Sequence, residues 1–547
     1  MASALVHGGT LVHGATVVDG TGAPPQAADT LVVDGRITAV EPPGRIPRET
    51  SSYAAVDATG LVVCPGFIDA HSHADTSPLL ETDDLSKIRQ GVTTEIVGNC
   101  GDSPAPAGPG SDGENPANPE SPESPEDTEN FLFPDGGRPY RSFTELFTAL
   151  DERGYVTNYC PLMGHGSLRL AAMGMRDARA TPEDLAVMRE LAHEALDAGV
   201  FGLSSGLIYP PGAYSDRAEL ASLAGLLPDG RVYATHMRDE NERLLSSIEE
   251  TLDVARRAGC RVQVSHLKCG GRDSWGRMPE AVRLLDDARA AGVRVTHDVY
   301  PYEAASTHLS ACLPPWAHEG GPGALLRRLN DRGELRRIRA AVEAEHSAGW
   351  ENLVAGAGGY SSIMVSSTRS HSYEGRTLDE IGARLGMAPF DAMVQVLCEE
   401  RLQVTMVGFC MEERDIEVAM TAPGAMVGSD GLPFGTGGRP HPRLFGTFPR
   451  VLGRYVRERR TLELADAVRR MTSLPADTFS VPGRGRVAVG AVADLVALDP
   501  ATVSHPGDYL EPDVAPTGIS WVMMAGEVVV SDGRWAGTRR GRRLIPA

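Results

Sequence analysis

The sequence predicts an α/β protein: a (β/α)8 barrel of the TIM type joined to a small β-sandwich domain that both ends of the chain build. The middle of the chain alternates apolar, strand-like runs with helical patterns, which is typical of βαβ units and a parallel sheet. Both ends carry short β-rich runs separated by Asp-Gly turns. The 547 residues suffice for a large barrel and an accessory domain.

Eight runs in the central part predict the eight strands of the barrel, because each is short, apolar and bounded by turn or helix signals. The candidate strands are residues 62–70, 92–98, 155–162, 200–205, 231–236, 261–266, 293–299 and 424–429. Helical patterns at Pro182–Leu196, Glu240–Ala258 and Pro279–Ala291 fit between several of these strands. A further apolar run at residues 352–355 is a candidate extra strand in the long gap before the last one.

These patterns predict three segments. Residues 1–60 form the first part of the β-sandwich, residues 61–477 form the barrel, and residues 478–547 form the second part. Residues 102–137 interrupt the barrel with Pro, Ser, Asn and acidic residues, and such a composition buries too little apolar surface to order itself. We interpret this insertion as a mobile surface loop, with a lid over the site as the alternative.

Composition excludes several classes of partner. The formal net charge of −21 argues against nucleic acid, and no stretch is apolar enough for a membrane span. The first residues lack the basic and apolar regions of a signal peptide, and the eight cysteines show no CxxC spacing. A cytoplasmic, reduced protein that acts on a small molecule is the simplest interpretation, and the sequence leaves its oligomeric state open.

Metal-ligating side chains follow five of the predicted strands. Side chains two apart on a strand share one face about 7 Å apart, so the pair His71 and His73 can hold one divalent metal. One His-x-His is weak evidence, but further ligand types end other strands, and all of these ends meet at the mouth of a barrel. The full set is His71, His73, Cys100, His236, His266 and Asp430. A metal there activates water, which predicts a hydrolase.

The motifs around these residues make the chain resemble the amidohydrolase superfamily, and in detail the N-acyl-D-amino-acid deacylases (D-aminoacylases). The resemblance covers nearly the whole chain and rests on segments 65–73, 98–101, 164–166, 204–207, 236–238, 265–268, 300–302, 428–431, 441–443 and 470–476. It implies zinc-dependent hydrolysis of the amide bond of N-acyl-D-amino acids, which releases a carboxylate and a free D-amino acid. The preference for the D isomer comes from the resemblance alone.

The resemblance also implies how the metal is held. Many binuclear amidohydrolases bridge two metals with a carboxylated lysine on strand four, but residues 200–205 contain no lysine. The resemblance implies that the Cys100 thiolate takes that place and that Cys100, His236 and His266 hold one tight zinc ion. A second, weaker position lies near His71 and His73, and the sequence leaves one metal or two open.

Asp430 is the candidate catalytic residue, because it follows the last strand and can accept a proton from water and pass it to the leaving nitrogen. The resemblance implies that Lys268, Tyr300, Ser306 and Arg443 bind the substrate α-carboxylate. From the residues alone, Lys268 lies two positions past His266 and reaches the same mouth. A loop-anchoring role fits Arg443 equally well.

Two other functions compete with this hypothesis. A cyclic-amide hydrolase of the hydantoinase or dihydroorotase type is disfavoured by Cys100 and by the absence of a lysine on strand four. A catalytically inactive scaffold is disfavoured because every candidate ligand is present. Among the remaining histidines, His165 has two equal interpretations, near the metal or packing a loop; we expect His297 to be structural and His308 to tune substrate preference.

Overall fold

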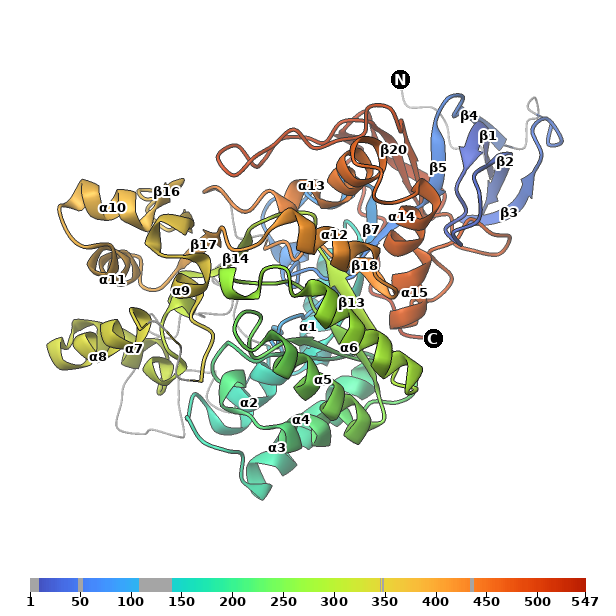
Figure 1. Ribbon diagram of the computed structural model, residues 1–547. Coiled ribbons are helices and arrows are strands. Elements are labelled where there is room, and N and C mark those ends of the chain that lie inside the picture. The colour runs from blue at the N-terminus through green and yellow to red at the C-terminus, as the bar shows by residue number, and fades with distance from the viewer. Residues whose placement is uncertain (1–8, 48–52, 108–139, 345, 347–348, 433–436) are drawn as a thin grey trace.

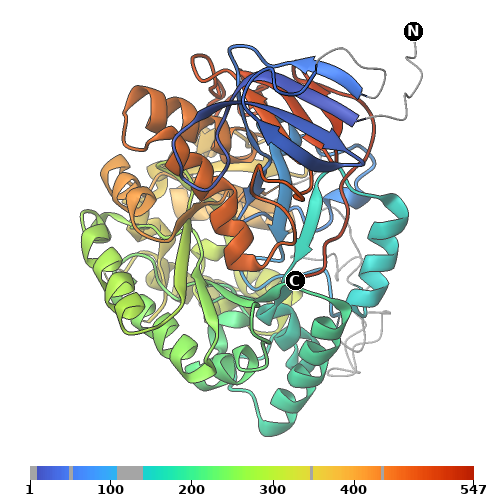
Figure 2. The ribbon, with the colours of Figure 1, turned by 90° about the vertical axis from the view of Figure 1, so that its right-hand side faces the viewer.

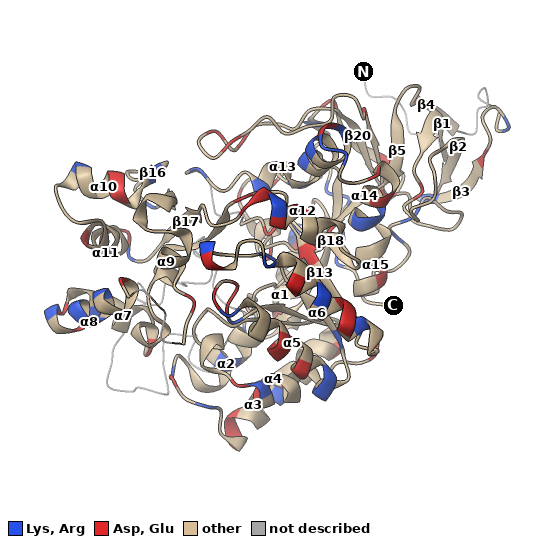
Figure 3. Ribbon diagram, viewed as in Figure 1, with Lys and Arg blue, Asp and Glu red and all other residues tan. Residues whose placement is uncertain are grey.

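The computed structural model describes residues 9–47, 53–107, 140–344, 346, 349–432 and 437–547. Parallel strands with helices around them form the central body, with a β-rich unit on one side and a mostly helical extension on the other (Figure 1). Basic and acidic side chains are interspersed along many of the outer helices (Figure 3). Among the described residues, no helix is long and apolar enough to cross a membrane.

The central strands form two parallel sheets, of order β18-β13-β12-β11-β10-β9 and β6-β7-β8. Hydrogen bonds join their edges: Ala70 N–H donates to the Val427 carbonyl (3.3 Å), and Phe201 N–H donates to the Pro161 carbonyl (2.6 Å). Each of the eight predicted runs includes residues of a strand in one of these two sheets. The strands are β6 (Phe67–Asp69), β7 (Val92–Val97), β8 (Asn158–Pro161), β9 (Met163–Gly164), β10 (Gly202–Gly206), β11 (Val232–His236), β12 (Arg261–Val264), β13 (Val295–Val299) and β18 (Ala425–Val427).

The first predicted strand, residues 62–70, is divided between two sheets. β5 (Val62–Pro65) pairs with β1 (Gly9–Val17) and β19 (Leu495–Leu498), whereas β6 pairs with β7. Gly66 separates them, and a Cβ there would lie 2.2 Å from the Thr93 hydroxyl, so only glycine fits. One apolar run thus contributes one strand to each of two sheets.

The helices of the central body confirm the three predicted ones. α3 (Pro182–Ala198) begins at a capping box between Thr181 and Asp184, and α5 (Leu244–Ala258) and α6 (Met278–Ala290) lie within four residues of the expected bounds. Figure 2 shows how these helices surround the strands. The others are α1 (Phe143–Arg153), α2 (His165–Met173), α4 (Arg217–Ala224), α12 (Glu413–Thr421), α13 (Arg443–Arg450), α14 (Leu464–Met471) and α15 (Ser473–Phe479).

Strands from both ends of the chain share one nine-stranded sheet, at the top of Figure 2. Its order is β22-β21-β20-β19-β5-β1-β2-β3, with β4 paired to β1. Val63, Leu495 and Trp521 contribute to a separate apolar core on it. The strands are β1 (Gly9–Val17), β2 (Gln26–Val33), β3 (Arg36–Glu41), β4 (Tyr53–Asp57), β5 (Val62–Pro65), β19 (Leu495–Leu498), β20 (Ile519–Met524), β21 (Glu527–Ser531) and β22 (Arg534–Trp535).

The long gap before the last central strand holds a subdomain, which we call the β13–β18 insertion (residues 300–412). It has its own apolar core, including Leu325, Ile338 and Phe390, and it extends to the left in Figure 1. Its elements are β14 (Ala305–His308), α7 (Gly321–Asn330), α8 (Arg332–Val342), α9 (Leu353–Ala357), β15 (Ile363–Thr368), β16 (Arg376–Thr377), α10 (Leu378–Leu385), α11 (Pro389–Glu399) and β17 (Val404–Gly408).

The prediction of a strand at residues 352–355 is wrong. Residues 353–357 form helix α9, and the Asn352 side chain caps it by accepting a hydrogen bond from Ala355 N–H (3.2 Å). A four-residue apolar run does not distinguish a strand from a buried helix, whereas Asn before such a run is a helix-start signal.

The predicted surface loop at 102–137 starts later than expected. Ser103 is buried: its hydroxyl accepts a hydrogen bond from Gly164 N–H, and its N–H donates to the Ser167 hydroxyl, both at 2.9 Å. Ser103 therefore packs against the start of α2. The rest of the loop, from residue 108, lies outside the described residues.

Candidate metal centre

Cys100, His236 and His266 converge on one point at the carboxyl ends of the strands. The Cys100 Sγ atom lies 3.8 Å from His236 Nδ1 and 3.5 Å from His266 Nε2. Tetrahedral zinc, with Zn–S near 2.3 Å and Zn–N near 2.05 Å, places sulfur and nitrogen ligands about 3.6 Å apart. The thiol and the two imidazoles therefore have the spacing that one zinc ion requires.

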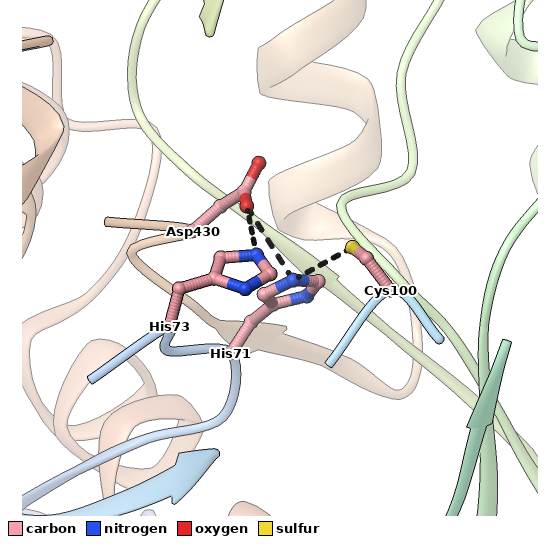
Figure 4. A group of neighbouring side chains, drawn as sticks. All are labelled: His71, His73, Cys100 and Asp430. Carbon is pink, nitrogen blue, oxygen red and sulfur yellow. Dashed lines mark hydrogen bonds and ion pairs between the residues drawn. The ribbon is translucent and has the colours of Figure 1, made fainter. Parts of the chain in front are cut away.

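A second group shares the same thiol: His71, His73, Cys100 and Asp430 (Figure 4). His71 Nε2 lies 3.4 Å from Cys100 Sγ and 3.4 Å from Asp430 Oδ1, and His73 Nε2 lies 3.0 Å from the same carboxylate oxygen. The structure thus brings together all six residues that the sequence predicted. Because Cys100 belongs to both groups, its sulfur lies where it can bridge two metal positions.

Three of these residues have a left-handed backbone, with φ of 54° at Cys100, 36° at His266 and 50° at Asp430. Such φ values are uncommon for residues other than glycine and persist where surrounding contacts impose them. His266 N–H donates to Asp298 Oδ1 at 2.9 Å, and Asp430 N–H donates to the His71 carbonyl at 2.7 Å. These bonds hold both side chains toward the metal centre.

Glu240 is a site residue that sequence reasoning missed. Its Oε1 lies 3.1 Å from His266 Nδ1, and its Oε2 lies 3.5 Å from His236 Nε2, so one carboxylate faces the outward nitrogen of both imidazoles. Lys268 Nζ lies 2.5 Å from the same Oε2. The four-residue spacing from His236 was the available signal, but it is not specific, because acidic residues near helix starts are common.

Asp298 faces the outward nitrogen of His71 as Glu240 faces those of His236 and His266, with its Oδ1 3.4 Å from His71 Nδ1.

A further buried network centres on Lys87, which is 1% exposed. Its ammonium donates to Asp69 Oδ2 (2.7 Å), the Ser429 hydroxyl (2.8 Å) and Glu95 Oε2 (3.3 Å). This network ties the end of β6 to β7 and to the segment that carries Asp430, so it fixes the positions of the strand ends.

Burial sets the protonation of the ligands. Burial lowers the pKa of His236 and His266 well below the usual range, so both rings are neutral at pH 7, which is the form that binds metal. Burial, with the Asp430 carboxylate nearby, raises the pKa of the Cys100 thiol well above its usual value. A thiolate here needs a cation beside it, which a metal ion supplies.

Asp430 is ionised in spite of its burial. Burial alone would raise its pKa, but chiefly the Arg443 guanidinium holds that pKa well below the usual range. Arg443 Nη1 lies 2.8 Å from Asp430 Oδ2. The carboxylate is therefore a negative group at the metal centre throughout the neutral range.

The four predicted carboxylate-binding residues lie beside this centre. Lys268, Tyr300 and Ser306 line one pocket together with five of the six candidate ligands, His73, Cys100, His236, His266 and Asp430. Arg443 lies behind them: it is 1% exposed, its Nη2 donates to the Ser306 carbonyl (3.0 Å), and its guanidinium lies 4.6 Å from the Tyr300 ring centroid. From the residues alone, a loop-anchoring role fitted Arg443 as well as substrate binding did. In this structure its contacts are those of an anchoring residue.

Three other histidines have distinct surroundings. His165 Nε2 lies 2.7 Å from Glu219 Oε1, and His165 contributes to neither metal group, which favours the packing interpretation. His297 Nε2 donates to the Ala419 carbonyl (2.9 Å) and is structural, as expected. His308 lines the pocket beside Ser306.

The fold and the metal centre define a class of protein. Residues 54–530 match the Amidohydrolase family, and the chain therefore belongs to that family. The chain is 35% identical to the D-aminoacylase of Alcaligenes xylosoxydans xylosoxydans, over 99% of this chain and 97% of the relative. The resemblance to N-acyl-D-amino-acid deacylases that the motifs indicated is confirmed.

Solved structures agree with this assignment. The N-acyl-D-glutamate deacylase of Bordetella bronchiseptica, solved with zinc and a phosphonate mimic of the tetrahedral intermediate, is 35% identical with a TM-score of 0.80, and the match covers 98% of this chain and 99% of that one. A D-hydantoinase is 15% identical with a TM-score of 0.53, over 98% of this chain and 100% of that one, which shows a shared fold alone.

Proposed function

We propose that this protein hydrolyses the amide bond of N-acyl-D-amino acids with the help of zinc, releasing a carboxylate and a free D-amino acid. The observation that carries the proposal is the convergence of Cys100, His236 and His266 at the spacing of tetrahedral zinc ligands. The relatives named above support both the chemistry and the D configuration of the substrate.

Cys100, His236 and His266 would hold one tight zinc ion, and His71 and His73 would complete a weaker second position that shares Cys100. Zinc in such a site supplies Lewis acidity, which polarises a carbonyl and lowers the pKa of water toward about 7. The outward nitrogens of His236 and His266 face Glu240, and that of His71 faces Asp298. These carboxylates orient the rings so that the opposite nitrogens point at the metal.

Asp430 is the proton carrier in this mechanism. Its Oδ1 lies within 3.4 Å of the His71 and His73 imidazoles, in the metal group that also contains Cys100. As an ionised carboxylate it accepts a proton from the attacking water and donates that proton to the amide nitrogen, which leaves as an amine. Both transfers use the same side chain, because the nucleophile and the leaving group meet at one centre.

Lys268, Tyr300 and Ser306, which line the pocket together, would hold the substrate α-carboxylate. The Lys268 ammonium supplies the charge, and the two hydroxyls supply hydrogen bonds. Arg443 completes this set from behind, because its guanidinium joins the Ser306 backbone to Asp430 and so couples the carboxylate site to the proton carrier.

Contacts between strands also support a more detailed description of the fold. We infer that the central strands close into one (β/α)8 barrel within residues 61–477, supported by the parallel bridge between Ser72 and Gly431 and by the Ala70–Val427 hydrogen bond. Residues 1–60 and 478–547 would form the β-sandwich, supported by the sheet that the two ends share.

An assay of three substrates tests the proposal against its alternatives. We expect hydrolysis of N-acetyl-D-methionine, little hydrolysis of its L isomer, loss of activity with a chelator and recovery with added zinc. Ring opening of dihydrouracil would instead support a cyclic-amide hydrolase. Zinc-loaded protein that hydrolyses none of the three would support an inactive scaffold.

A further inference from the structure

The pocket over the metal centre has one wall that comes from the β13–β18 insertion. Leu353 and Ala357 of α9, Ile363 of β15 and Met406 of β17 line this wall, and each has an apolar side chain. Leu432, which follows Asp430 by two residues, faces the same space. The part of the substrate that lies against this wall therefore contacts an apolar surface.

Carboxyl groups outnumber Lys and Arg in the lining of this pocket, although burial raises the pKa of Asp75 to about 8 and that of Asp102 to about 7. Among the described residues that line it, Asp75, Asp102, Glu240, Glu351 and Asp430 carry carboxyl groups, and Lys268 is the single Lys or Arg. Glu351 is 6% exposed and its Oε2 has no hydrogen-bond partner; burial, together with the negative charges of Glu240 and Asp239, raises its pKa well above the usual range, so it is uncharged at pH 7.

No spare cation remains in this described lining. The Lys268 ammonium is paired with Glu240 and is the natural partner of one substrate α-carboxylate. His308 and His318 also line the pocket, but burial lowers the pKa of each to about 4, so both are neutral at pH 7. A second substrate carboxylate would therefore lose its hydration without gaining an ion pair, which is unfavourable.

We propose that the amino-acid side chain of the substrate is uncharged and apolar, as in N-acyl-D-methionine or N-acyl-D-leucine, and that this pocket excludes acidic side chains. The inference rests on the proposed function and narrows it. Sequence identity does not decide the point, because a D-aminoacylase and an N-acyl-D-glutamate deacylase are both 35% identical to this chain. The apolar wall and the single lysine, which is already paired with Glu240, decide which substrate side chain fits the pocket.

The first test compares kcat/KM of the zinc-loaded enzyme on the N-acetyl derivatives of D-methionine, D-leucine, D-glutamate and D-aspartate. We expect the kcat/KM of the neutral substrates to exceed that of the acidic ones by at least about 100-fold, because burying a carboxylate that gains no ion pair costs at least this much binding. Equal or better turnover of the acidic substrates would overturn this inference and leave the proposed function intact. No turnover of any D substrate would overturn both.

The second test adds a cation to the pocket. His308 is half-buried, so His308→Lys places an ammonium in the lining, and His308→Met is an uncharged control of similar length. We expect His308→Lys to lower the ratio of kcat/KM for N-acetyl-D-methionine over N-acetyl-D-glutamate at least tenfold, and His308→Met to change it less than threefold. Equal ratios in the two variants would contradict the missing cation as the cause of the exclusion.

Discussion

Glu240 offers a sharp test of the proposed metal centre, because its one carboxylate faces two of the histidines that we propose as ligands. Its Oε1 and Oε2 lie 3.1 and 3.5 Å from His266 Nδ1 and His236 Nε2. Losing one such partner typically lowers metal affinity by about 10- to 100-fold. Glu240→Gln keeps one acceptor oxygen, so we expect a loss in that range, and Glu240→Ala removes both, so we expect about 100- to 10,000-fold.

The assay is competition for zinc against a chromophoric chelator at pH 7.5, which does not depend on turnover. Glu250→Gln is the matched control, because Glu250 is also buried but pairs with Arg238, away from the metal groups. We expect that control to keep wild-type affinity within about threefold. A Glu240→Ala protein that is folded and binds zinc as tightly as the wild type would refute the reasoning.

Three further predictions concern the centre itself. Cys100→Ala removes one of three ligands to the tight ion and should weaken zinc binding by about 100- to 1,000-fold, measured by the same competition; unchanged affinity would remove the thiolate from the site. Zinc affinity should rise about tenfold per pH unit between pH 6 and 8: the raised pKa keeps Cys100 protonated there, so binding zinc releases one proton, and higher pH favours that release. A flat profile would mean that no thiol proton is lost. Asp430→Asn should keep the tight zinc but lower kcat by about 100- to 10,000-fold, and near-normal kcat would exclude it as the proton carrier.

The sequence predicted the strands and the ligands at their ends, because both depend on local pattern and on simple topology. Apolar runs mark β7, β11 and β12 directly, and parallel strands bring Cys100, His236 and His266 to one edge without any knowledge of packing. When a candidate ligand is identified at the end of a predicted strand, its approximate position in the fold is therefore known as well.

What could not be predicted depends on long-range contacts. Lys87 and Asp298 are charged residues whose burial is visible only when several strand ends meet. The split at Gly66 reflects a close approach to Thr93, which lies on another strand. The β13–β18 insertion has a core of its own, and its weak signals looked like a single extra strand.

The chemistry proposed here requires a zinc ion held by one thiolate and two imidazoles, and anomalous diffraction at the zinc absorption edge measures this directly. Crystals grown with one equivalent of zinc should show their strongest anomalous peak about 2.0–2.4 Å from Cys100 Sγ, His236 Nδ1 and His266 Nε2. A strongest peak elsewhere, with none at these three atoms, would contradict the account.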